Sequence, residues 1–466
     1  MWFTTTLEDD LRIIHSRVQH AVGQGSFHSA SVEVRMGRKA HYRYDYVYDC
    51  GALDGWQASP ALLKSLQRLD LEPRQDSGGQ LVIDALVLSH YDCDHIIGAE
   101  FLASRFLVRS IIAPFLSPLE LMLVLACQPD ALTAEQIGAL HRLATGGANG
   151  ELFGIPVTQV KPGPYDGPEN DIEDGHHQTE SIDQPPTVQM PSSMPAVVEG
   201  SNQPVGSTLP AGGAMRVTVP GTSMQPWRFK FWNRGVSDDL MESLFLELWI
   251  CGFPLHALED ANGAAELVNW LMSAQNRKAT LAAYNRAIVE YRPAWASEAA
   301  GKRLANFLSL GMYSGHTSKF EPLTTYFATS SVGYVKDQWR SASPLHRRFG
   351  PYALSRRMGW LGTGDAPLGE PDVWSDFNAC YRQELERVLT VQIPHHGAAP
   401  KAGPKFFNSA LLPENCMNAV ISAGARNRYG HPTTQVIKEV LAAHACLEIV
   451  TEESWLGFQE VFNFLL

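Results

Sequence analysis

The chain contains the stretch Ser89-His90-Tyr91-Asp92-Cys93-Asp94-His95-Ile96-Ile97-Gly98, directly after an apolar run at 85–88. The apolar run predicts a buried strand, and the glycine and apolar residues after His95 predict the start of a helix. Four metal-binding side chains therefore fall on a strand-to-helix turn, where imidazoles and carboxylates suit two adjacent divalent ions. The alternative is a polar turn that caps the next helix, but a cap needs only one oxygen acceptor.

The spacing of these side chains resembles the metallo-β-lactamase superfamily signature His-x-His-x-Asp-His, with Asp92 in the place of the second histidine. It is similar to the variant found in the hydrolase domain of ComEC-type DNA-uptake proteins and their stand-alone relatives. Further motifs of that family follow in the expected order at 22–25 with 32–34, 48–51, 306–310, 361–366, 391–397, and 422–424 with 427–432. The resemblance thus spans most of the chain.

This resemblance implies an α/β fold, the metallo-β-lactamase αβ/βα sandwich, with a helical and a disordered insertion. We expect the N-terminal half of that fold at 1–115, an insertion region at 116–304 and the C-terminal half at 305–466. Apolar periodicity predicts two helices within 117–145 and a helical block at 237–300. The Pro-rich, Gly-rich and acidic composition of about 161–220 predicts a flexible surface loop.

Two segments of the insertion region leave alternatives open. Residues 227–232 alternate aromatic with basic or polar side chains, which favours an edge or half-buried strand and also suits a nucleic-acid platform. The pair His176-His177 is either a metal site or, as we expect, exposed in the acidic loop. The helical block at 237–300 packs onto the core, covers the site as a lid, or forms a dimer or partner surface.

The resemblance also implies which residues bind metal. His90 and Asp92 would bind one divalent ion, Asp94 and His95 would bind a second, and Asp365 would bridge the two. The resemblance further implies that one member of the pair His395-His396 is a ligand or contacts one, while the other points into the core, and the sequence does not decide which.

The family's third-motif histidine is missing, because Asn306 stands in its place, and His316 farther along is the weaker substitute. A carboxylate and an amide in place of two imidazoles make the first ion's site rich in oxygen, which favours manganese or magnesium beside zinc. Asp49 is expected to hydrogen-bond a ligand histidine rather than to touch metal.

Two such cations would activate a hydroxide for attack on a phosphorus or carbonyl centre and neutralise charge on the leaving oxygen. We expect Asp94 to position the hydroxide and His431 to protonate the leaving group, although His431 also fits a structural turn. Ser309 and Asn427 are candidate donors to a substrate phosphate oxygen.

Length and composition limit the other classes of protein. The chain has 466 residues, and we interpret it as one large domain with insertions. Its seven cysteines are scattered and odd in number, which favours a reducing cytoplasm over a disulfide framework. Neither a signal peptide nor a membrane span is indicated, so we expect a cytoplasmic protein without a membrane partner.

The net charge of −12 disfavours binding of nucleic acid over the whole surface. Basic residues near the C-terminal motifs, including Arg426 and Arg428, nevertheless allow a local basic face. The leading hypothesis is therefore a phosphodiesterase or nuclease acting on DNA or RNA. The alternatives are a hydrolase of a small phosphorylated or cyclic nucleotide, and a non-catalytic partner protein that keeps the fold.

Overall fold

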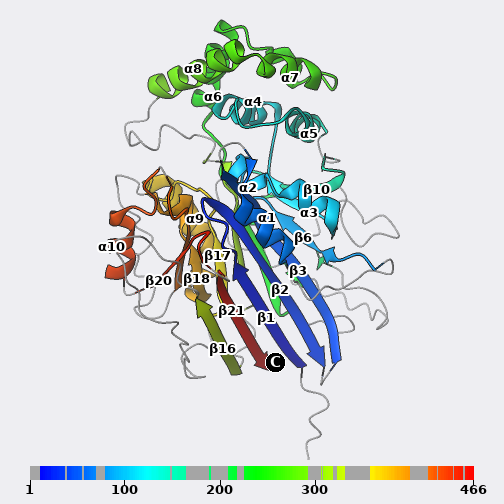
Figure 1. The fold of residues 1–466 in the computed structure, drawn as a ribbon, viewed down its shortest axis with the longest axis vertical. Helices are drawn as coiled ribbons and strands as arrows, with labels where there is room; N and C mark the ends of the chain where they lie inside the picture. Colours follow the sequence, from blue (N-terminus) through cyan, green and yellow to red (C-terminus); the bar gives the residue numbers. More distant parts are fainter. Residues whose placement is uncertain are drawn as a thin grey trace, which may run out of the picture.

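Two β-sheets pack face to face between layers of helices in the structure, which is a computed structural model (Figure 1). It describes residues 11–36, 39–54, 57–69, 79–146, 150–163, 188–189, 208–217, 225–291, 306, 308–317, 323–330, 357–398, 418–427, 429–443, 445–454 and 457–465.

The first sheet joins the two ends of the described chain. Its strand order is β12-β10-β8-β6-β3-β2-β1-β21-β16, with β4 and β9 added beside β3 and β10. The strands are β1 (Leu11–Gln19), β2 (Gly25–Met36), β3 (Lys39–Asp54), β4 (Gln57–Ala58), β6 (Ala85–Val87), β8 (Ile111–Pro114), β9 (Glu151–Leu152), β10 (Ile155–Val160), β12 (Thr208–Leu209), β16 (Leu323–Ser330) and β21 (Phe458–Leu465). The neighbours β3, β6, β8 and β10 run parallel, so their carboxyl ends lie at one edge of the sheet.

The second sheet has the order β11-β13-β14-β15-β17-β18-β19-β20. The strands are β11 (Val188–Gln189), β13 (Ala214–Val217), β14 (Trp227–Trp232), β15 (Gly311–His316), β17 (Gly359–Gly362), β18 (Val388–Gln392), β19 (Asn418–Ser422) and β20 (Cys446–Val450). Strands β17 to β20 are parallel. A small pair, β5 (Val82–Ile83) with β7 (Leu107–Val108), stands apart.

Helices cover the outer face of each sheet (Figure 1). The first sheet carries α1 (Pro60–Gln67), α2 (Cys93–Ile96), α3 (Ala99–Arg105), α4 (Pro118–Cys127) and α5 (Ala134–Thr145), with α6 (Asp238–Ile250), the 3-10 turn η2 (Leu255–Leu258), α7 (Ala264–Met272) and α8 (Ala274–Tyr291) beyond them. The second sheet carries α9 (Pro371–Tyr381), the turns η5 (Leu385–Arg387) and η6 (Pro394–Gly397), and α10 (Thr434–Ala442). The expected fold class, an α/β sandwich of two sheets between helices, is confirmed.

Three apolar cores hold these layers together. Aromatic side chains such as Tyr46, Phe229 and Trp360 fill the space between the sheets. A second core joins the first sheet to α1–α8, and a third joins the second sheet to α9 and α10. Burial of this apolar surface is the main favourable term in the stability of such a sandwich.

Two of the predicted helical regions are confirmed in the described residues. Capping boxes begin both helices of the 117–145 region, at Ser117 for α4 and Thr133 for α5. The block expected at 237–300 contains α6, α7 and α8.

The prediction for 227–232 was right about the strand and wrong about its position. β14 lies between β13 and β15, and all six of its residues are buried, so it is neither an edge nor a half-buried strand. Its basic side chains, Arg228 and Lys230, enter the interior because the buried carboxylate of Glu384 pairs with both. That partner lies 154 residues beyond Lys230 in the chain and is invisible to a local pattern.

Strands of both sheets fall inside the region 116–304 that was expected to be an insertion, namely β9, β10, β11, β12, β13 and β14. That region therefore combines core strands with added helices. The flexible loop expected at about 161–220 includes β11, β12 and β13, which the sequence did not predict, and most of its remainder, with His176 and His177, lies outside the described residues.

Within the described residues, no helix combines the length and the apolar character that crossing a membrane requires. All six cysteines in that part of the chain are free thiols.

Candidate metal centre

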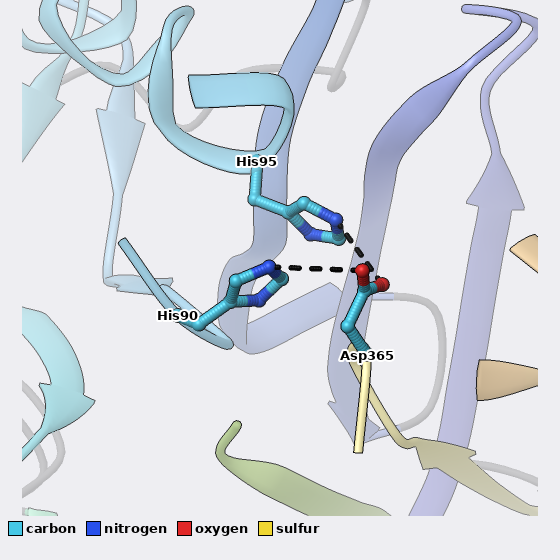
Figure 2. Close-up of side chains that lie close together, drawn as sticks. All are labelled: His90, His95 and Asp365. Carbon is cyan, nitrogen blue, oxygen red and sulfur yellow. Dashed lines mark ion pairs between the residues drawn. The ribbon is translucent and has the colours of Figure 1, made fainter. Parts of the chain in front are cut away.

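The predicted metal ligands meet where strands of both sheets end. His90 and Asp92 follow β6 on the loop into α2, Asp94 and His95 lie within α2, and Asp365 follows β17. His395 and His396 follow β18 in the turn η6. Figure 2 shows the rings of His90 and His95 pointing toward the carboxylate of Asp365, which approaches from the other sheet.

A close approach of β3 to α2 fixes the position of this loop. The backbone N–H of Gly98 donates to the carbonyl of Cys50 at 2.7 Å. A Cβ atom on Gly51 would lie 2.5 Å from the backbone nitrogen of His95, which is closer than real Cβ contacts allow. Gly51 is therefore required for α2 to lie against the strand.

The two oxygens of Asp365 face different groups of ligands. Oδ2 lies 3.9 Å from His90 Nε2 and 3.7 Å from His395 Nε2, and His90 Nε2 lies 3.8 Å from a carboxylate oxygen of Asp92. Oδ1 lies 3.4 Å from His95 Nε2 and 3.9 Å from His396 Nε2. A bridging carboxylate between two cations would have this arrangement.

The second group is completed by Asp94, whose Oδ2 lies 3.6 Å from His396 Nε2. When possible ligand atoms within 4.8 Å of one another are grouped, His95 belongs to two groups. One contains His90 and Asp365, and the other contains Asp94 and His396. We place it with Asp94, because its shorter contact with Asp365 is to Oδ1, the oxygen that His396 also faces.

Hydrogen bonds orient three of the histidine rings. His95 Nδ1 lies 2.8 Å from Asp49 Oδ2, and His396 Nδ1 lies 2.9 Å from the carbonyl oxygen of Ser422. Both acceptors lack a proton, so each Nδ1 is the donor. His90 Nδ1 lies 2.8 Å from Ser89 Oγ, which donates its own proton to Asp49 and so accepts from the ring. Each Nε2 is left facing the carboxylates, as in metal-binding histidines held by an outer partner.

Burial and charge act in opposite directions on the titration of this cluster. Burial lowers the pKa of His90 to about 4, with a further contribution from His95. Burial also lowers the pKa of His95, but the carboxylates of Asp49 and Asp365 outweigh it and hold that pKa well above the usual value. Burial raises the pKa of Asp365, yet His395, His95 and His396 keep it well below the usual range. The cluster thus favours positive charge between its carboxylates.

Backbone strain is concentrated at the same place. Four non-glycine residues in the described chain have positive φ, and three of them are Asp49 (56°), His395 (50°) and His396 (53°). Two consecutive left-handed residues turn both imidazoles of η6 toward Asp365. Strain of this kind persists where the surroundings enforce it and is frequent at functional sites.

Asn306 and Ser309 lie beside the centre, and His316 does not belong to it. The amide of Asn306 is 3.4 Å from His395 Nδ1, and its side chain is buried. Ser309 is fully buried, with no hydrogen-bond partner for its Oγ in the described chain. His316 lies in β15 opposite Trp227, outside both ligand groups.

The loop after β19 forms the outer side of the site. His431 lies 5.7 Å from His395, measured between ring centroids, and the exposed ring of Tyr429 stacks on His431 at 6.1 Å and 9°. Asn427 donates to the carbonyls of Gly424 and His431 and accepts from the N–H of His431. The amide of Asn427 therefore stabilises the conformation of this loop.

Sequence reasoning missed Gln128, which follows α4. Its Nε2 donates to the carbonyl of Tyr91 at 2.9 Å, and its Oε1 accepts from the N–H of Cys93 at 3.3 Å. One amide thus holds the backbone on both sides of Asp92. No local signal marks it, because it stands 35 residues after Cys93. Ser89 was within the quoted motif, but its bonds to Asp49 and His90 needed the structure.

The residues fit divalent metal ions. Within the described chain, the buried atoms of the cluster that lack a hydrogen bond include Nε2 of His90, of His95 and of His396, and Oδ2 of Asp365. Zinc lies about 2.0–2.2 Å from such atoms, which puts neighbouring tetrahedral ligands about 3.4 Å apart. The observed separations of 3.4–3.9 Å are close to that value and too long for good hydrogen bonds.

Comparison with known families agrees with this geometry. Residues 46–189 match the metallo-beta-lactamase superfamily. Proteins of this superfamily are generally metal-dependent hydrolases, and the matched range contains Asp49 and the four predicted ligands from His90 to His95. Asp365, His395 and His396 lie beyond it and are joined to it by the fold. A search of curated proteins gave no match to the chain.

Proposed function

We propose that the protein is a two-metal phosphodiesterase that cleaves DNA or RNA. The observation that carries this proposal is the convergence of three buried Nε2 atoms on Asp365, each in a ring whose Nδ1 is already hydrogen-bonded. Such rings are prepared to bind a cation and have no other partner in the described chain.

His90, Asp92 and His395 would hold one ion, Asp94, His95 and His396 would hold the other, and Asp365 would contribute to both. When bound, divalent ions supply the Lewis acidity that activates water and neutralises charge on a leaving oxygen. The first group carries an extra carboxylate from Asp92, which favours manganese or magnesium beside zinc.

Side chains of the protein would orient the attacking water, protonate the leaving group and bind the phosphate. Asp94 is half-buried at the edge of the second group, where its carboxylate can orient the attacking water. The ring of His431 lies 5.7 Å from that of His395, and its imidazole can donate a proton to the leaving group. Ser309 offers a buried hydroxyl to a phosphate oxygen.

Nucleic acid is favoured as the substrate by the loop that carries His431. Tyr429 presents an exposed ring parallel to His431, and planar bases stack on such rings. Arg426, exposed in the same loop, offers a cation to the phosphate backbone. Arg428 and most of the other basic residues near the C-terminal motifs lie outside the described residues.

One observation favours the alternative, a hydrolase of a small phosphorylated or cyclic nucleotide. The net charge of −12 opposes tight binding of a long polyanion, whereas a small nucleotide needs few cations. The two candidates differ in salt dependence, because only a polymer releases many counterions when it binds.

The test measures metal content together with manganese-dependent cleavage of labelled single- and double-stranded oligonucleotides. Wild type should contain metal and cut an oligonucleotide, with KM rising steeply with salt. Asp94→Ala should lose both properties, and Arg426→Glu should keep its metal but bind the oligonucleotide more weakly. Turnover of a cyclic nucleotide without cleavage of any oligonucleotide would support the alternative. A metal-loaded protein inert toward both substrates would be a non-catalytic partner protein.

A further inference from the structure

Exposed apolar side chains gather on the helical block α6–α8. Of the eleven large apolar residues that are exposed in the described chain, six belong to these three helices: Phe245, Leu246, Trp249, Ile250, Met272 and Val289. Figure 1 shows α7 and α8 at one end of the molecule, on the side of α4 and α5 away from the sheets. The clustering in one outer layer points to a contact surface.

Four of these residues form one stripe along α6, which we call the α6 stripe: Phe245, Leu246, Trp249 and Ile250. Positions separated by three and four residues lie on the same side of a helix, and the opposite side, with Leu244 and Leu248, is buried. Trp249 is 67 % exposed and Ile250 is 61 % exposed. A helix whose two sides are both apolar is incompletely covered by the described part of its own chain.

The charges around the α6 stripe are mostly negative. Residues 237–289 contain seven Asp and Glu and three Lys and Arg, a balance of −4. Two of the three cations are paired in the structure, Arg277 with Asp130 and Arg286 with Glu247. Three acidic side chains in the first turns of α6, Asp238, Asp239 and Glu242, are exposed. Glu242 continues the stripe one turn toward the N-terminus.

A cavity of about 560 Å³ adjoins the end of the α6 stripe. Its aromatic wall is Trp249, Phe253 and Trp270, and its polar wall includes Glu266, which pairs with His256 at 3.0 Å. Aromatic faces beside a carboxylate suit the stem and cation of a lysine or arginine side chain. The cavity therefore repeats the chemistry of the stripe, apolar contact next to negative charge.

We propose that the α6 stripe and this cavity bind a basic segment of a partner protein, an amphipathic stretch with Lys or Arg on one side and apolar residues on the other. Charge complementarity selects this occupant. A second copy of the chain would bring together two surfaces that are both net negative, which like charge disfavours. The surface lies outside the metal centre and does not depend on its chemistry.

The test is selection of a random peptide display library on the immobilised full-length protein. Trp249→Glu serves as the counter-selection target, and Leu441→Glu, at an exposed leucine of α10, serves as the matched control. Selected peptides are then synthesised, and their Kd values are measured by fluorescence anisotropy at low and high salt.

We expect enriched peptides to combine Lys or Arg with aromatic or aliphatic residues at helical spacing. Their affinity should fall at least about 10-fold in Trp249→Glu, as for a central aromatic residue of an interface. Affinity should stay unchanged in Leu441→Glu and weaken as salt rises. Circular dichroism and metal content check that both variants fold.

Three outcomes would overturn the proposal. The first is that no peptide is enriched over Trp249→Glu, and the second is that the enriched peptides are acidic or uncharged. The third is a concentration-dependent dimer in sedimentation velocity that Trp249→Glu disperses, which would assign the surface to a second copy of the chain.

Discussion

Two of the clusters of charged side chains that the protein buries differ in how completely their polar atoms are paired. Between the sheets, Arg17 donates to Glu460 at 2.6 Å, to the carbonyl of Met358 at 2.8 Å and to Thr390 at 2.9 Å. Asn418 donates to the same Glu460 carboxylate. At the strand ends around Asp365, by contrast, three imidazole nitrogens face carboxylates without a hydrogen bond.

This difference separates a structural ion pair from a binding site. A buried charge is tolerated when an opposite charge and hydrogen bonds satisfy it, as they do for Arg17. The Asp365 cluster has carboxylates from Asp49, Asp94 and Asp365, but within the described chain its only ion-pair partners are histidines. A cation from solution is what the second cluster lacks and the first does not need.

The largest effect is expected from Asp365→Asn, which removes the charge shared by both ligand groups. We expect metal content to fall and hydrolysis to slow by at least about 10³-fold, because several kcal/mol of charge stabilisation are lost. Elemental analysis and initial rates measure this. Asp372→Asn, at a half-exposed carboxylate of α9, should keep both properties. Full metal retention in Asp365→Asn would contradict the interpretation of the Asp365 cluster as a cation-binding site.

Arg17→Met tests the cluster of Arg17 and Glu460, in which both charges are paired. It leaves the carboxylate of Glu460 buried without its cation, which should lower the free energy of unfolding by about 3–5 kcal/mol. Metal content of the folded protein should not change. Urea denaturation gives the free energy. As a control, Arg35→Met should cost only about 0–1 kcal/mol, because the Arg35 side chain is 37 % exposed beside Glu33. Adding Glu460→Leu should restore part of the loss, and a further loss would contradict this account.

Asp49→Asn should sharpen the comparison without destroying either cluster. The amide replaces the carboxylate that accepts from His95 Nδ1, so the ring loses its charged partner. We expect metal affinity to fall by about 10–100-fold, as for other outer partners of metal-binding histidines. Competition with a chromophoric chelator measures the affinity. Unchanged affinity would mean that Asp49 serves only to hold Ser89, whose backbone N–H and hydroxyl both donate to it.

The last effect concerns pH and His15, which lies beside Arg17 between the sheets. Burial, with a contribution from Arg17, lowers its pKa from 6.5 to about 3. The unfolded chain therefore binds a proton below pH 6.5 that the folded chain refuses, and stability falls as pH drops from 6.5 toward 3. Each such proton contributes about 1.4 kcal/mol per pH unit.

Urea denaturation of metal-free wild type and His15→Gln across this range measures the contribution of His15. The variant should lose less stability on acidification, because its amide does not titrate. Parallel curves for the two proteins would show that His15 accepts its proton in the folded state.

The sequence predicted the part of the centre that is continuous in the chain. His90 to His95 could be found because strand, ligands and helix follow one another within a few residues, and Asp365 stands in an equally local motif. The geometry of His395 and His396 was not predictable. It depends on two consecutive left-handed residues and on the carbonyl of Ser422, 26 residues later.

Long-range pairing explains what the sequence missed in the fold. The burial of β14 depends on Glu384, and the satisfied cluster joins Arg17 to a residue 443 positions away. Periodicity reports which faces of a segment are apolar, but it does not identify the distant carboxylate that lets a lysine or arginine be buried. The fold class was therefore predictable, whereas the position of β14 was not.

The amide of Gln128 makes the helices between the two halves of the fold hard to remove. A minimal enzyme trimmed to the two sheets would lose both hydrogen bonds that hold the backbone around Asp92. Arg277 of α8 ties the neighbouring Asp130 to the outer helices, so shortening α8 alone would free one end of the same support. For anyone engineering this scaffold, the added helices and the loop around Asp92 form one structural unit and must be transferred together.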